Sequence, residues 1–174
     1  MPNSLLVIAI ATLYLARLQA GFPDRSLHST GRSGQLELSL SAPKAEYAVG
    51  EMVPVTMTLG NIGPGPAALR PSTIWLFDFA VYDDSGRQID TWAGGRPFPM
   101  APPTPITIRP GEVITRTLVW DLALPGPDGR KSLRPGRYAL EGFLSGSRDF
   151  RGGLGRPGAY PLPLRTPRLV INVH

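Results

Sequence analysis

The chain has 174 residues, of which 20 are glycine, 20 are proline and none is cysteine. Because glycine costs about 1 kcal/mol and proline about 3 kcal/mol inside a helix, this composition disfavours a helical bundle. The missing cysteine excludes disulfides and thiolate chemistry. The length predicts one domain, and 42% hydrophobic residues can form a packed core. The net charge is +5, but the basic residues are scattered and form no run, so we expect no nucleic-acid partner.

Histidine is also scarce. The two histidines, His28 and His174, lie in a polar segment and at the last position. Zinc sites use Cys and His, and Ser–His or Cys–His nucleophile pairs need a histidine within the domain. We therefore expect no metal, no cofactor and no enzymatic activity.

The N-terminus carries an apolar run, LLVIAIATLYLA, at 5–16. It has the length of a signal-peptide core and is too short for a membrane span, and Leu-Gln-Ala at 18–20 offers a cleavage site. Residues 1–20 thus predict an export signal to the periplasm, cell envelope or medium. An uncleaved membrane anchor and a cytoplasmic protein are the alternatives. The polar residues 21–35 predict a linker before a domain that spans 36–174.

Apolar and polar residues alternate with period two from residue 36 onward, which indicates half-buried strands. No ten-residue helical period occurs. Pro54 predicts an edge strand or a bulge where it falls. Asp83 and Asp84 match no calcium-loop spacing and are expected in a hairpin turn, and Asp128-Gly129 predicts another hairpin tip. The seven predicted strands are 36–40, 53–59, 77–82, 87–92, 113–120, 138–144 and 169–173.

Glycine recurs just before predicted strands, as Val-Gly-Glu at 49–51, Pro-Gly-Glu at 110–112 and Pro-Gly-Arg at 135–137. Proline followed by glycine suits the two central positions of a type II turn, where glycine supplies the positive φ. Strand openings of this kind, spaced through an all-β chain, predict a two-sheet sandwich of about seven antiparallel strands.

Two stretches rich in glycine and proline do not form strand patterns, at 94–105 and 145–167. Loops of this length are uncommon in compact domains, and they are usually functional or disordered. In the first loop, proline would hold Arg96, Phe98 and Met100 outward in an extended form that is already ordered for binding a protein partner. The alternative is a stiff connection with Phe98 in the core.

The tryptophans are expected mainly in the core. Trp92 and Trp120 lie on predicted strands, and large aromatic side chains dominate sandwich cores. Trp92 has a second interpretation, in which it rims the proline-rich loop. The position of Trp75, just before a predicted strand, leaves its role undetermined.

Several of these elements together resemble a known family. The order and spacing of the motifs over 36–144, followed by the last predicted strand, resemble the BsuPI family, the intracellular proteinase inhibitors of bacilli and their relatives. The residues that carry the resemblance are Phe77-Asp78-Phe79-Ala80-Val81-Tyr82-Asp83, Gly86, Trp92, Phe98, Pro110-Gly111-Glu112, Trp120-Asp121, Pro135-Gly136-Arg137-Tyr138 and Gly142.

The resemblance implies an immunoglobulin-like β-sandwich and a non-enzymatic protein-binding domain. It also implies inhibition of a subtilisin-like serine proteinase, whose apolar pocket would accept Phe98 or Met100. The sequence departs from the family pattern in its export signal, in Pro99-Met100 after the loop phenylalanine, and in an apparent insertion at 145–167. The alternative function is therefore an exported, envelope-associated structural or interaction module without inhibitory activity.

Overall fold

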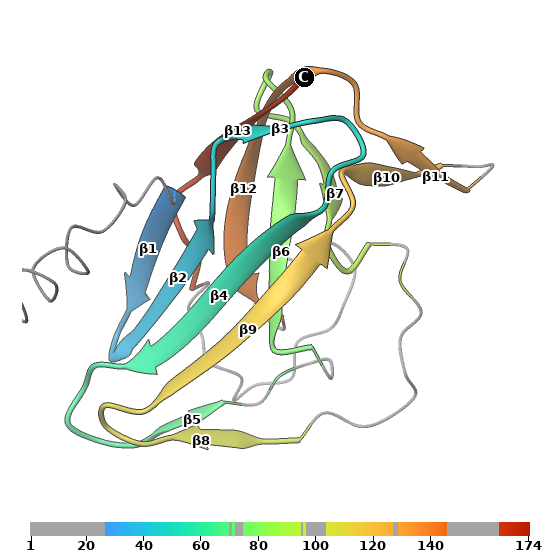
Figure 1. Cartoon of the computed structure of the whole chain (residues 1–174). Coiled ribbons are helices and arrows are strands. Elements are labelled where there is room, and N and C mark those ends of the chain that lie inside the picture. Colours follow the sequence, from blue (N-terminus) through green and yellow to red (C-terminus); the bar gives the residue numbers. More distant parts are fainter. Residues whose placement is uncertain are drawn as a thin grey trace, which may run out of the picture.

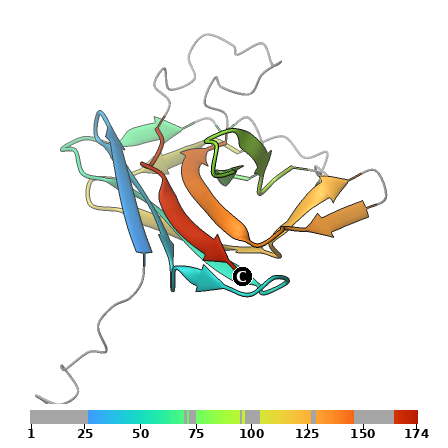
Figure 2. The same cartoon turned by 90° about the horizontal axis from the view of Figure 1, so that it is seen from above.

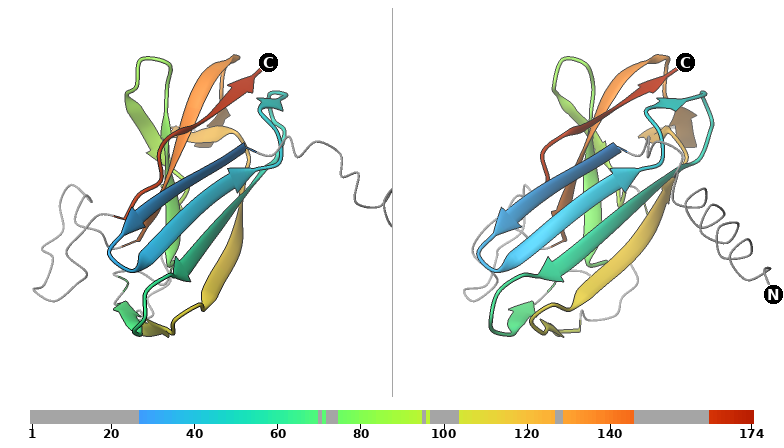
Figure 3. Two further views of the ribbon diagram at one scale, coloured as in Figure 1. Left: turned by 90° about the vertical axis from the view of Figure 1, so that its left-hand side faces the viewer. Right: turned by 60° about the vertical axis from the view of Figure 1, so that its left-hand side comes forward.

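The protein is an all-β sandwich of two layers (Figures 1 and 3), seen here in a computed structural model that describes residues 27–69, 71, 75–94, 96, 104–126, 129–145 and 164–174. Sheet A contains, in spatial order, β1 (Leu27–Ser33), β2 (Leu36–Ala42), β4 (Val53–Asn61) and β9 (Val113–Trp120). Sheet B contains β3 (Glu46–Tyr47), β13 (Leu169–Val173), β12 (Gly136–Leu144), β6 (Phe77–Tyr82) and β7 (Gln88–Thr91).

Two short antiparallel pairs complete the fold. One pair joins β5 (Ala67–Leu69) to β8 (Ile106–Ile108), and the other joins β10 (Ala123–Gly126) to β11 (Gly129–Ser132). The β10–β11 hairpin projects from the side of the sandwich (Figures 1 and 2). The order β6, β12, β13 in one sheet and β2, β4, β9 in the other is that of the C, F, G and A, B, E strands of immunoglobulin-like sandwiches.

The core lies between the two sheets, and the residues of β2, β4 and β13 alternate between it and the outside. Leu36, Leu38 and Leu40 of β2 are buried, whereas the residues between them are partly exposed. Trp120 is only 1% exposed and meets Phe79 edge to face, with 6.0 Å between ring centroids. The expected core position of Trp120 is therefore confirmed.

All seven predicted strands are present, and six further strands accompany them in the described ranges. One of these, β1, corrects the expectation of a linker at 21–35, because Leu27–Ser33 pairs along its whole length with β2. The strand was not predicted because its sequence is polar and shows no alternation of apolar residues. The expected signal at 1–20 lies outside the described residues, as does most of the expected insertion at 145–167. Within the described part of the chain, no helix has the length and apolar character of a membrane span.

Two of the three predicted type II turns are confirmed. The amide of Glu51 donates to the carbonyl of Ala48, and that of Glu112 to Arg109, with the intervening Gly50 and Gly111 at φ of 80° and 76°. Each glutamate also accepts a hydrogen bond from the amide three residues earlier. The third turn, at 135–137, is wrong, since Gly136 has φ of 157° and already begins β12.

Pro54 lies where it removes no hydrogen bond from the sheet. β2 pairs with β4 only as far as Ser41 opposite Thr56, so Pro54 has no neighbour on that side. On its other side it lies opposite Val119 in an uninterrupted register. The expectation of an edge strand or bulge is wrong for β4, which is central, because the proline falls past the end of β2.

The hairpin of β6 and β7 forms as expected, and its turn explains the acidic residues there. The Asp83 carboxylate accepts hydrogen bonds from the Ser85 hydroxyl, at 2.6 Å, and from the Arg87 amide, at 3.0 Å. The β10–β11 hairpin also forms, although Asp128 at its tip lies outside the described residues.

Candidate functional site

The root of the proline-rich loop is a tight, hydrogen-bonded structure that follows directly from β7. The amide of Trp92 donates to the carbonyl of Phe79 on β6, at 2.9 Å. The next two turns are closed by the amide of Gly94 on Thr91, at 2.9 Å, and by the amide of Arg96 on Ala93, at 3.1 Å. The chain therefore leaves sheet B in a defined direction.

Three side chains stack at this root, and we call them the Trp–Arg stack: Trp75, Trp92 and Arg96. The two indole rings meet edge to face, with centroids 5.5 Å apart. The guanidinium of Arg96 lies over the Trp92 ring, 4.3 Å from its centroid. Cation–π and edge-to-face contacts of this kind are each worth about 0.5–1.5 kcal/mol at partly exposed positions, so the stack holds its own geometry.

The stack is also fixed to the end of β9 in the other sheet. Both the Trp92 indole N–H and the Arg96 guanidinium donate to the carbonyl of Val119, at 3.0 and 3.4 Å. The Arg96 Nε donates to the Trp92 carbonyl, at 2.8 Å. Arg96 therefore does not project outward as expected, because its guanidinium is folded back over Trp92. The loop root links the two layers of the sandwich.

Asp78 lies beneath the loop root and is 2% exposed. Its carboxylate accepts hydrogen bonds from the amides of Phe79, at 2.8 Å, and Ala93, at 3.1 Å, and from the Thr91 hydroxyl. Burial raises the pKa of Asp78 to about 6 from its ordinary value of 3.8, because the loss of hydration outweighs these hydrogen bonds. A carboxylate thus ties the loop root to β6 at neutral pH.

The structure brings together some of the expected site residues. Arg96 and Trp92 meet, and Trp92 takes both roles considered for it, since it packs partly against the core and also rims the loop. Phe98 and Met100 lie outside the described residues, so their role as partner contacts stays a prediction. Trp75 is placed by its contact with Trp92.

Sequence reasoning missed the part played by Asp78. Period-two alternation assigns it to a solvent-facing position, but all six residues of β6 are buried, so both faces of that strand are covered. A single acidic residue inside the apolar run FDFAVY was the available signal.

Two exposed apolar side chains lie at the end of sheet A to which the stack is bound. Val119 is 47% exposed, and Met52, which immediately precedes β4, is 59% exposed. Since Val53 pairs with Trp120, both lie at the same end of sheet A. Tryptophan and arginine dominate the energetic centres of protein interfaces, and exposed apolar residues around them exclude water. This end of the sandwich has the composition of a protein-binding surface.

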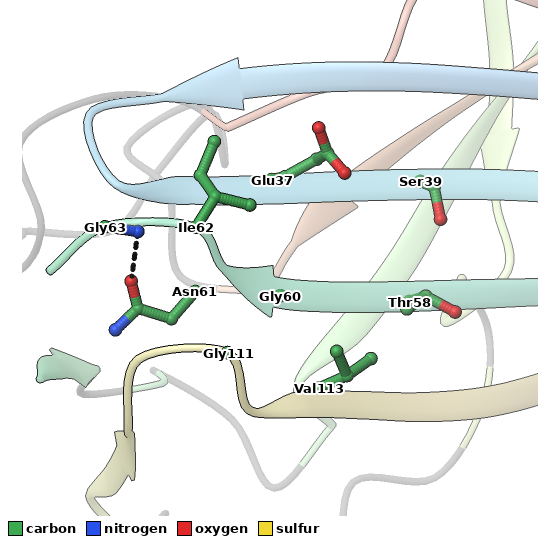
Figure 4. A pocket seen from close by; sticks show the side chains of 9 residues that line it. All are labelled: Glu37, Ser39, Thr58, Gly60, Asn61, Ile62, Gly63, Gly111 and Val113. Atoms are coloured by element: carbon green, nitrogen blue, oxygen red, sulfur yellow. Dashed lines mark hydrogen bonds between the residues drawn. The ribbon is translucent and has the colours of Figure 1, made fainter.

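A second candidate is a hollow on the outer face of sheet A (Figure 4). Gly60 has no side chain there, and the hollow lies between Ile62 and Val113, which are 53% and 56% exposed. Asn61 at its end is buried and accepts a hydrogen bond from the amide of Gly63, at 3.0 Å. The wall is otherwise made of Ser, Thr and Glu side chains of β2 and β4. It offers an apolar rim and one carboxylate, that of Glu37, which forms an ion pair with Arg32.

Among the residues that the structure describes, no three His, Asp or Glu side chains gather as a metal site requires.

Solved structures with similarity to the chain share little sequence with it. A β-glucosidase from Listeria innocua in complex with gluconolactone is 15% identical with a TM-score of 0.43, and the match covers 79% of this chain and 16% of that chain. The alkylpurine DNA glycosylase AlkC of Pseudomonas fluorescens, bound to DNA containing an abasic site analog, is 14% identical with a TM-score of 0.45, over 82% and 31%. The C-terminal domain of wzt is 11% identical with a TM-score of 0.46, over 88% and 80%.

These TM-scores are too low to support an argument, and the chain spans only a minor part of the glucosidase and the glycosylase. No curated protein matches the chain. The model of a protein family does match it, over residues 40–149 and thus more than half of its length. That family is described as "BsuPI: Intracellular proteinase inhibitor". The span includes β6, β7, the loop root and β9, so the chain belongs to the BsuPI family of intracellular proteinase inhibitors.

Proposed function

We propose that this protein is a non-enzymatic inhibitor that binds a proteinase through the root and body of its proline-rich loop. The Trp–Arg stack is the observation that carries the proposal. It joins two tryptophans and an arginine at the point where the loop leaves the sandwich. Family membership supports a proteinase as the partner.

Rigidity is what an inhibitory loop requires, because each side chain and backbone segment ordered on binding costs free energy. Here the ordering is already complete at the root. Arg96 is held by a ring contact and by hydrogen bonds to two carbonyls, and Ala93 is held by Asp78. A loop that starts from such a root loses less conformational entropy when it binds, so less of its binding free energy is offset.

The target class follows from the chemistry of the loop sequence. Phe98 lies between two prolines, and Met100 follows the second of them, so these two apolar residues would be held in an extended form that suits the apolar specificity pocket of a subtilisin-like serine proteinase. Arg96 and the exposed Val119 would contact the rim of that pocket. The proposed site therefore has an apolar centre and one positive charge.

An inhibition assay against a panel of subtilisin-like and other serine proteinases tests the proposal. We expect the full chain to inhibit at least one subtilisin-like enzyme. Replacing Phe98→Ala or Met100→Ala should raise the inhibition constant by about tenfold or more, since a buried interface anchor is worth about 2 kcal/mol. Arg137→Ala, at an exposed position on β12, is the matched control and should not change it.

The Trp–Arg stack needs its own variant. Trp75→Ala removes one ring from the stack and should weaken inhibition without altering the loop sequence. No inhibition and no complex at micromolar concentration with any proteinase would refute the proposal. The alternative, an envelope-associated module without inhibitory activity, would then be favoured.

The compartment restricts which proteinases the protein meets. The family description favours the cytoplasm, whereas the apolar run at 5–16 favours export. Mass spectrometry of the mature N-terminus from separated cell fractions distinguishes them. A chain that starts after residue 20 supports export, and an intact N-terminus in the cytoplasm refutes it.

A further inference from the structure

The two edge strands of sheet A differ in what lies beside them. At one edge, β1 is covered by the segment before β13: the Ser29 hydroxyl donates to the carbonyl of Pro167, at 2.6 Å. At the other edge lies β9, with eight residues, and no described strand pairs with its outer side. An uncovered edge strand of this length presents backbone donors and acceptors that another strand can bind.

The register shows which backbone groups of β9 face outward. The carbonyl of Val119 accepts from Trp92 and Arg96, which lie away from β4, so it points to the open side. In an antiparallel pair the groups alternate in direction. Because the β4–β9 register is uninterrupted, Thr117 and Thr115 also direct their N–H and C=O groups outward.

Side-chain contacts confirm which backbone groups of β9 face outward. The hydroxyls of Thr117 and Thr56 are 3.1 Å apart, and so are those of Thr115 and Thr58. Such close side chains are typical of the pairs that do not exchange backbone hydrogen bonds. The outward N–H and C=O groups of Thr115 and Thr117 are therefore arranged as one side of a β-ladder.

The chemistry beside this edge is specific. Ile114 and Arg116 lie on the face of β9 turned toward sheet B, but Ile114 is only partly buried and Arg116 is exposed. The Arg116 guanidinium donates to the carbonyl of Thr115, at 2.9 Å, and no described carboxylate forms a salt bridge with it. An apolar and a positively charged side chain thus stand two residues apart along the open edge.

We propose that the open edge of β9 binds an extended segment of a partner protein, which adds to sheet A as a further strand and places an acidic side chain opposite Arg116. An apolar residue two positions away in that segment would face Ile114. Backbone hydrogen bonds to Thr117 and to the N–H of Thr115 hold the segment. The acidic side chain draws the Arg116 guanidinium away from the Thr115 carbonyl, which can then join the ladder, and the charge thereby selects the segment. This site goes beyond the proposed inhibition and does not depend on it.

A second copy of the chain is the less suitable occupant. The β9 strand of the second copy would place its own Arg116 at the position where the site requires an acidic side chain. An antiparallel pair centred on that residue would set two guanidinium groups opposite each other, which is destabilising. An inward-facing charge on an edge strand is a common protection against self-association.

Fluorescence anisotropy with a labelled peptide tests the proposal on the full chain. The probe is Thr-Val-Thr-Glu-Thr-Val-Thr, in which Val, Glu and Val share one face, so that either strand direction can place Glu opposite Arg116. The matched peptide carries Lys in place of Glu. We expect the Glu peptide to bind about tenfold more tightly than the Lys peptide, as one charge pair of about 1.4 kcal/mol would give.

Variants locate the binding. Arg116→Glu should reverse the preference between the two peptides, whereas Arg137→Glu, the same change on β12, should leave it unaltered. Thr117→Pro removes an N–H that faces the open edge and keeps every hydrogen bond between β9 and β4. Pro54 is a natural example of the same arrangement, because its missing N–H would face away from β9. The substitution should weaken binding of the Glu peptide about tenfold. Circular dichroism checks that the Thr117→Pro variant is folded. If that variant is unfolded, the peptide preference of Arg116→Glu tests the proposal in its place.

Three results would overturn the proposal: no binding of the Glu peptide, equal binding of both peptides, or a preference that Arg116→Glu does not reverse. Sedimentation analysis adds a fourth, a dimer of the parent chain that Thr117→Pro dissociates, since the edge would then be occupied by a second copy.

Discussion

Replacing Asp78→Asn should change how the stability of the protein depends on pH. Asp78 is the buried carboxyl that accepts hydrogen bonds from the amides of Phe79 and Ala93, and asparagine can keep an oxygen in that position. Asparagine has no charge to lose or gain. The difference between the two proteins therefore isolates the titration of this one group.

The sign and size follow from the raised pKa. Burial raises the pKa of Asp78 from 3.8 to about 6, so between these values the folded protein holds a proton that the unfolded chain has lost. Its contribution to stability is complete below pH 3.8 and is lost as the pH rises through about 6. At about 1.36 kcal/mol for each pKa unit, the ionised carboxylate costs about 3 kcal/mol relative to the neutral acid.

Urea denaturation at pH 3.5 and pH 7.5 measures this quantity. The free energy of unfolding of the variant minus that of the parent should be about 3 kcal/mol more positive at pH 7.5 than at pH 3.5. Asp90, whose pKa is also raised by burial, is present in both proteins, and its charge is a minor cause of the raised pKa of Asp78. A difference that stays constant with pH would refute the argument.

Asp83→Asn provides a control of opposite sign. Hydrogen bonds from the Ser85 hydroxyl and the Arg87 amide and guanidinium lower the pKa of Asp83, so its ionised form is the favoured one. Its contribution to stability is present above its ordinary pKa and is lost as the pH falls. The Asp83→Asn variant should therefore lose stability relative to the parent as the pH rises.

Three further substitutions test the packing of the fold by thermal and urea denaturation. Asn61→Ala should destabilise by about 2 kcal/mol or more, because the buried amide bonds the backbone of Gly63, Gly65 and Ile108; an unchanged midpoint would contradict this. Gly142→Ala should cost about 1–3 kcal/mol, since a Cβ would lie 2.8 Å from the end of Met57. Thr166→Val should cost about 1–2 kcal/mol by leaving the amide of Gly142 unpaired, and a loss of less than about 0.5 kcal/mol would contradict that account.

The longer strands could be predicted from sequence because each has one buried face. Val53–Asn61 alternates between buried and partly exposed positions through all nine residues, so its pattern is complete. The two residues of β3 and the three of β5 are too few to show alternation. β1 lacked a signal for a different reason. It buries Ser29 rather than a large apolar side chain, against a segment more than 130 residues away.

The site was less predictable than the strands because it is made by topology. Arg96 and Val119 meet only because the loop after β7 crosses to the end of β9 in the other sheet, and no spacing in the sequence encodes that crossing. Proline content correctly indicated an unusual loop, yet it suggested an outward Arg96. The cation–π contact with Trp92 reversed that direction. Local propensity predicts where a loop begins, whereas contacts from remote strands decide where its side chains lie.

The carbonyl of Val119 separates the two proposed surfaces and makes them independently testable. It is occupied by Trp92 and Arg96, so a strand added to β9 forms ladder hydrogen bonds only up to Thr117, and the terminal threonine of the probe opposite Val119 lies beyond that ladder. Trp75→Ala, which alters the stack, should therefore weaken proteinase inhibition and leave the anisotropy of the Glu peptide unchanged. Arg116→Glu should do the reverse. If either variant impaired both measurements while circular dichroism showed a folded domain, the two surfaces would be a single site, and the division at Val119 would be wrong.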